Sequence, residues 1–124
     1  MIKETILGCS LLLVSTASLA GGCDNPRNAY DQTYCASLEM VQLDQELNVE
    51  YKKVIGLLNP QQKQMLKQSQ IQWLKIRDDK CSDGSLLYVS CSNKIMKNRI
   101  DFLKGVEREC KSTGCDSNKL TQQQ

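Results

Sequence analysis

Apolar residues recur at steps of three and four along residues 40–58, which places them on one face of a helix. The residues on that face are Met40, Leu43, Leu47, Tyr51, Val54 and Leu58. Asn25-Pro26 and Asp31 are both acceptable caps, so this helix is expected to begin near residue 26 or near residue 32. Asn59-Pro60 is expected to end it and to open the next helix, because asparagine caps a helix and proline suits its first position.

Two further helices follow from the same spacing. The second is predicted from Pro60 to about Asp79, with an inner face of Leu66, Ser69, Trp73 and Ile76. The third is predicted from about Ser92 to near Cys110, with an inner face of Ile95, Met96, Arg99, Leu103 and Val106. Short connections make consecutive helices antiparallel, so residues 21–115 are expected to form one all-α domain, a small up-down-up bundle of three main helices. Residues 116–124 are polar and are expected to be a disordered tail.

The first twenty residues have the pattern of a signal peptide. Lys3 supplies a basic start, an apolar run follows over residues 6–14, and Ser18-Leu19-Ala20 fits the small-x-small cleavage pattern. The apolar run is too short for a membrane-spanning helix, which needs roughly 20 residues. We therefore expect an exported protein, in the periplasm or outside the cell, with no transmembrane segment in the mature chain.

The alternative export signal is a lipoprotein box ending at Cys23, in which that cysteine is lipidated. Ala20 stands where such boxes favour leucine. Cleavage after Ala20 leaves six cysteines, an even set that fits a disulfide framework in an oxidising compartment. Lipidation of Cys23 would leave one of the other five unpaired, so we expect no lipid anchor there.

The predicted topology restricts how these cysteines pair. Cys35, Cys81 and Cys91 fall at one end of the bundle and Cys110 at the other, about 27 Å away along the third helix. A disulfide needs its Cα atoms within about 7 Å, so we predict that Cys110 pairs with Cys115. Cys81–Cys91 and Cys23–Cys35 are favoured because both are local, and pairing of Cys35 with Cys81 or Cys91 is the main alternative.

The chain contains no histidine, which removes Ser-His-Asp and Cys-His catalysis and any histidine-ligated metal. The cysteines lack paired C-x-x-C spacing, so disulfides are expected in place of zinc. The net charge of +2 comes without a Lys/Arg stripe, which argues against a nucleic-acid partner. Carboxylates are available, yet neighbours such as Asp78 and Asp79 point about 100° apart on a helix. We expect no catalytic residue, no cofactor and no metal.

The stretch QWLKIRDDKC, residues 72–81, holds the only tryptophan of the chain. Trp73, Arg77 and Cys81 are four residues apart and share a helix face. One interpretation makes Trp73 a ligand platform. The favoured one makes it the centre of a small core, with Arg77 closing its edge as a polar clasp by pairing with an acid of the first helix, Glu46 or Glu50.

The loop between Cys81 and Cys91 is the candidate partner-binding segment. It contains turn residues at 82–84, and it presents Leu86, Leu87, Tyr88 and Val89 in a short ring. These apolar residues either fold back to cap the bundle or form a preorganised binding loop, since a cross-linked loop loses less entropy on docking. The candidate contact residues are Asp83, Leu86, Leu87 and Tyr88.

The ordered set Leu-Asn-x-x-Tyr at 47–51, Gln-x-x-Trp-x-x-x-Arg-Asp-x-x-Cys at 70–81 and Arg-x-x-x-Leu at 99–103 resembles the LprI-like family of small exported bacterial proteins, named after a lysozyme inhibitor. The resemblance implies a small helical domain stapled by disulfides, and it implies inhibition of a cell-wall hydrolase. Its shared positions coincide with the predicted interior and its polar edge: Leu47, Asn48, Tyr51, Trp73, Arg77, Asp78 and Cys81.

Two functions follow as hypotheses. The first is an exported, non-enzymatic binding protein that blocks a lysozyme-type muramidase, with the 82–90 loop as the contact. The second is an envelope interaction or stress protein whose partner is another envelope protein and not a hydrolase.

Overall fold

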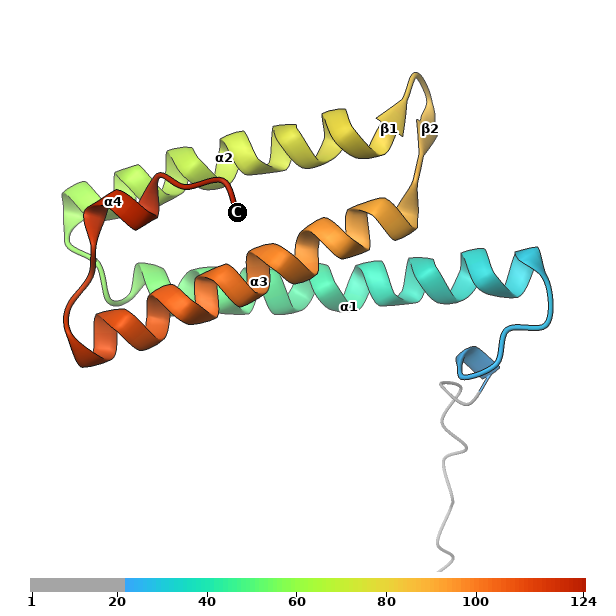
Figure 1. Cartoon of the computed structure of the whole chain (residues 1–124), viewed down its shortest axis with the longest axis horizontal. Coiled ribbons are helices and arrows are strands. Elements are labelled where there is room, and N and C mark those ends of the chain that lie inside the picture. The colour runs from blue at the N-terminus through green and yellow to red at the C-terminus, as the bar shows by residue number, and fades with distance from the viewer. Residues whose placement is uncertain (1–21) are drawn as a thin grey trace, which may run out of the picture.

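The computed structural model describes residues 22–124, and the predicted signal peptide lies outside them. Three long helices are α1 (Ala29–Ile55), α2 (Pro60–Cys81) and α3 (Val89–Ser112), and a short α4 (Ser117–Leu120) follows. A two-stranded hairpin, β1 (Ser82–Asp83) and β2 (Leu86–Leu87), joins α2 to α3. Figure 1 shows α1, α2 and α3 running in alternating directions. The predicted all-α, up-down-up bundle is confirmed.

The helix ends follow from local capping chemistry. The Asn28 side chain accepts a hydrogen bond from the Asp31 main-chain N–H at 2.8 Å, so α1 begins at Ala29, between the two predicted starts. Asn59 and Gln62 form a reciprocal capping box, with Pro60 in the first turn of α2. The predicted start of the second helix at Pro60 is therefore confirmed, whereas α1 ends at Ile55, before the Asn59-Pro60 pair that was expected to end it.

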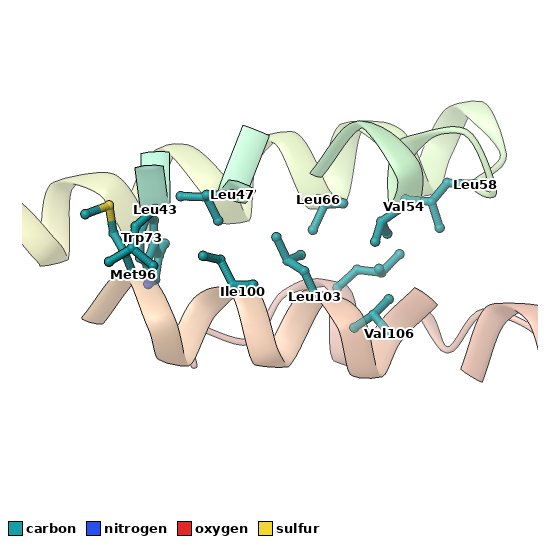
Figure 2. Packing of buried hydrophobic residues seen from close by; sticks show 11 residues of the cluster. Leu43, Leu47, Val54, Leu58, Leu66, Trp73, Met96, Ile100, Leu103 and Val106 are labelled. Carbon is teal, nitrogen blue, oxygen red and sulfur yellow. The ribbon is translucent and has the colours of Figure 1, made fainter. Parts of the chain in front are cut away.

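The core lies where α1 and α2 face α3. Figure 2 shows apolar side chains of the two green helices meeting those of the orange α3. The labelled members are Leu43, Leu47, Val54, Leu58, Leu66, Trp73, Met96, Ile100, Leu103 and Val106. Burying one such leucine contributes about 1.5–3 kcal/mol, so these positions supply most of the stabilising free energy of a chain this small.

The C-terminal residues differ from the expectation of disorder. After Gly114, whose φ of 105° favours glycine, the chain forms α4 and places Leu120 fully inside the core. Residues 121–124 then lie between α2 and α3, as Figure 1 shows. The polar composition suggested a free tail, but the burial of one leucine and hydrogen bonds to α2 and α3 order the segment.

Three disulfides staple the fold in the favoured arrangement. Cys23 pairs with Cys35, Cys81 with Cys91 and Cys110 with Cys115, and the Cα–Cα distances are 5.5, 5.4 and 4.1 Å. Each bond is local in sequence, and the length of α3 separates the second from the third. Cys23 forms a disulfide in this structure, as the even cysteine count predicted.

Candidate binding site at the hairpin end

The β1–β2 hairpin closes one end of the bundle and is fixed at its base. Cys81, the last residue of α2, is fully buried and bonded to Cys91 in the first turn of α3. The Tyr88 N–H donates to the Cys81 carbonyl oxygen at 2.8 Å, and Ser82 pairs with Leu87 across the strands. Gly84 takes a φ of 60° at the tip, a conformation that glycine adopts readily. The hairpin is thus cross-linked and hydrogen-bonded where it leaves the helices.

The apolar residues of the hairpin face solvent. Leu86 is 62% exposed, and Leu87 and Tyr88 are each 50% exposed. Of the two interpretations left open by the sequence, this exposure favours the binding loop, and only Leu87 also lines the groove described below. Clustered exposed leucine and tyrosine on a rigid loop are typical of an interaction surface.

A groove lies beside the hairpin, between α1, α2 and the start of α3. Its volume is about 350 Å³. Met40, Val41, Leu87 and Met96 form its apolar walls, and its polar rim is formed by Asp44, Gln45, Arg77, Asp78 and Ser92. Methionine side chains adapt their shape to a bound group, which suits such a groove to an inserted apolar side chain. We call this cavity the hairpin groove.

An apolar stripe on α1 extends this surface. Tyr30, Tyr34, Leu38 and Val41 are exposed, and their spacing of four, four and three residues places them on one helix face. Val41 also lines the hairpin groove, so stripe and groove are continuous. The stripe was not predicted from the sequence, although its spacing was the available signal.

Arg77 does not clasp an acid of α1, and that prediction was wrong. Its Nε and Nη2 atoms donate to Asp78 Oδ1 at 2.9 and 2.8 Å, and its guanidinium lies 5.7 Å from the centre of the Trp73 ring. The predicted core position of Trp73 is correct, since the side chain is 2% exposed. Arg77 therefore closes the edge of Trp73 from the groove side, with its own neighbour as counter-ion.

The two acids proposed for the clasp face α3. Glu46 Oε1 accepts a hydrogen bond from Lys104 Nζ at 2.8 Å, on the exposed side of the α1–α3 contact. Glu50 is buried against Glu107 of α3, with Lys53 at 3.7 Å. Helical spacing correctly placed both acids on α1, but Glu46 pairs with Lys104 of α3 and Glu50 with Lys53 of its own helix. Tyr51, also assigned to the clasp, packs half-buried against the core.

Burial and the nearby Glu107 carboxylate raise the pKa of Glu50 above its usual range. The folded state therefore holds a proton that the unfolded chain releases near pH 4.3. The free energy of unfolding falls as the pH rises from about 4.3 to the raised pKa of Glu50. Glu50→Gln should then raise the free energy of unfolding near pH 8 by about 1 kcal/mol, because the amide donates to Glu107 without carrying a charge. Urea denaturation from about pH 4 to pH 8 measures this.

The control for this prediction is Glu46→Gln, one turn away on the exposed side of α1. It removes only a surface ion pair, worth about 0–1 kcal/mol, and should keep the pH profile of the parent. Equal stabilities of Glu50→Gln and the parent across the whole pH range would show that ionisation of Glu50 does not destabilise the folded state.

A match to a protein-family model shows which family the chain belongs to. The family model described as lysozyme inhibitor LprI matches residues 23–103. The chain belongs to the LprI family. The resemblance read from the sequence motifs is thereby confirmed. Searches of curated proteins and of solved structures gave no match.

The LprI match has a clear structural extent. It covers α1, α2, the hairpin and α3 as far as Leu103, and so includes the whole candidate surface. The Cys110–Cys115 disulfide, α4 and residues 121–124 follow it. Across the described part of this LprI chain, no helix combines the length and apolar character needed to cross a membrane. The same residues hold no group of three acidic or cysteine side chains positioned for a metal ion.

Arg99 is the residue of the LprI domain whose environment the sequence did not reveal. It is 0% exposed, and its guanidinium lies 5.7 Å from the Trp73 ring centre and 5.0 Å from that of Phe102. It donates to Gln70 Oε1, Ser69 Oγ and the main-chain oxygens of Gln122 and Gln124. Burial lowers the pKa of Arg99 to about 10. An arginine inside an apolar repeat was the signal, but its hydrogen-bond partners could not be identified from the sequence.

Proposed function

We propose that this protein is an exported, non-enzymatic inhibitor of a lysozyme-type cell-wall hydrolase, and that it binds the enzyme with its hairpin end. The observation that carries the proposal is the LprI family match over a domain whose hairpin presents Leu86, Leu87 and Tyr88 to solvent. The disulfide framework supports export, because such bonds persist in oxidising compartments.

The shape of the hairpin suits a mechanism of cleft occlusion. Glycosidases of this type place two carboxylates on either side of an open substrate cleft. A narrow hairpin with exposed apolar side chains can enter such a cleft and exclude the glycan strand. The Cys81–Cys91 bond holds the hairpin in one conformation before binding, which lowers the entropy lost on docking.

The hairpin groove supplies the second part of the contact. It can take an apolar side chain from the rim of the enzyme cleft against Met40 and Met96. Asp44 and Asp78 at its polar rim favour a basic neighbour beside that side chain. The hairpin would thus fill the cleft while the groove holds its edge.

The test is a lysis assay. Purified protein in micromolar excess should slow the clearing of a cell-wall suspension by at least one of the main lysozyme types. No effect on any type would remove the proposal. Capture of an endogenous non-hydrolase partner from envelope extract, together with no inhibition, would favour the envelope interaction function.

A further inference from the structure

The apolar stripe of α1 continues along the helix and faces away from the core. Its exposed members are Tyr30, Tyr34, Leu38, Val41 and Val49. At about 100° per residue these side chains fall within an arc of roughly 100°, nearly opposite the core residues Leu43, Leu47 and Val54. Among residues 22–124, α2 exposes one large apolar side chain and α3 exposes none. The exposed apolar surface of the long helices is therefore gathered on the outer side of α1.

The spacing along the stripe is that of a helix–helix contact. Steps of four, three and four residues lead from Tyr34 through Leu38 and Val41 to Gln45, and Val49 follows four residues later. Steps of three and four residues keep side chains facing one neighbouring helix along its length. The pattern therefore indicates a second helix lying along α1 as the occupant of the stripe.

The charges of α1 match those of an antiparallel copy of itself. Asp31 lies in the first turn of α1, and Lys52 and Lys53 lie in its last turn. Lys52 is exposed, lies on the same arc as the stripe and takes part in none of the ion pairs of residues 22–124. In an antiparallel pair the acidic start of each helix meets the basic end of the other, and the two helix dipoles are opposed.

We propose that two copies of this protein pair through the stripe, with their α1 helices antiparallel. A two-fold axis near Val41 places Tyr34 of each copy beside Val49 of the other. Asp31 of each copy then lies beside Lys52 of the other. Both copies use the same patch, so the assembly closes at two. The stripe is much smaller than a standard interface of about 20–30 residues a side, so the dissociation constant is on the order of 100 µM.

This pairing does not depend on the function proposed for the hairpin end. Val41 also lines the hairpin groove, but the monomer predominates at the micromolar concentrations of the lysis assay. A membrane surface is the other class of occupant for an exposed apolar stripe. Helices that lie on membranes carry lysine or arginine along their polar face, whereas residues 29–51 contain acids and neither of these bases. The charges of α1 therefore favour a second copy over a membrane.

Sedimentation equilibrium of the purified protein, from about 10 µM to about 1 mM, tests the pairing. The average mass should rise with concentration from the monomer towards the dimer and no further. In the ¹⁵N-labelled protein, the same rise in concentration should shift amide signals of α1 between residues 30 and 52 and leave those of α2 in place. A protein that stays monomeric over this range overturns the proposal. If that monomer sediments with phosphatidylglycerol vesicles, the stripe serves a membrane instead.

Two variants locate the interface. Leu38→Asp places a charge within the stripe and should raise the dissociation constant of the dimer by about tenfold or more. Lys52→Glu places like charges beside Asp31 of the other copy and should raise it by about threefold at low salt. The matched controls are Ile71→Asp and Lys67→Glu at exposed positions of α2, and both should dimerise as the parent does. If Lys52→Glu dimerises as tightly as the parent, the proposal is overturned, even where Leu38→Asp fails to fold.

Discussion

Trp73→Ala is expected to lower the free energy of unfolding by about 3–5 kcal/mol, the cost of removing a large aromatic side chain from a packed core. Trp73 is 2% exposed, and the guanidinium groups of Arg77 and Arg99 each lie 5.7 Å from its ring centre. The substitution leaves a cavity and takes from the buried Arg99 one of the two rings that cover it. Urea denaturation followed by circular dichroism measures the loss, because the variant has no tryptophan fluorescence.

Ile71→Ala is the matched control for that prediction. Ile71 lies on the same helix, two residues before Trp73, and is 58% exposed. Its replacement should change stability by no more than about 0.5 kcal/mol, as surface substitutions usually do. A loss below about 1 kcal/mol for Trp73→Ala would show that the tryptophan is not the centre of the core.

Replacing Leu87 with aspartate and Tyr88 with alanine together is expected to weaken binding to the target hydrolase by at least about thirtyfold, or about 2 kcal/mol. Both side chains are half-exposed at the hairpin, and Leu87 also lines the hairpin groove. The fold should persist, because the hydrogen bond at this site comes from the Tyr88 main chain. Titration of lysozyme activity against the parent and the double variant gives the ratio.

Ile71→Asp supplies the control for the hairpin variant. It places the same charged residue at an exposed apolar position about 15 Å along α2 from Cys81, away from the proposed contact. It should inhibit as the parent does. Equal loss of inhibition in both variants would mean that apolar surface in general, and not the hairpin, determines binding.

Local chemistry made much of the fold predictable. Asn59-Pro60 fixes a helix boundary through contacts within four residues, so the sequence suffices there. The Cys110–Cys115 pairing followed from helix length alone, because no rearrangement of a straight α3 brings Cys110 to the hairpin end. The 81–91 loop was located by its flanking cysteines and turn residues, and its exposure agrees with one of the two interpretations.

The failures concern competition between possible partners, several of them distant in the sequence. Spacing placed Arg77 beside Trp73, but it could not show that Lys104 already holds Glu46 and that Asp78 holds Arg77. The C-terminal residues had no local signal for order. Leu120 is ordered because the core accepts it, and residues 121–124 are ordered because Arg99, more than twenty residues earlier, needs acceptors. A helical repeat of apolar residues does not show which of several possible partners a side chain contacts in the folded protein.

Amide hydrogen exchange, measured with and without a lysozyme that the protein inhibits in the lysis assay, tests whether the hairpin end is the contact. We expect slower exchange at residues 82–88 and in α1 around Val41, where the hairpin, the groove and the stripe meet. Exchange in α4, at the other end of the bundle, should not change. Protection confined to another face, or inhibition with no protection of the hairpin, would contradict the account.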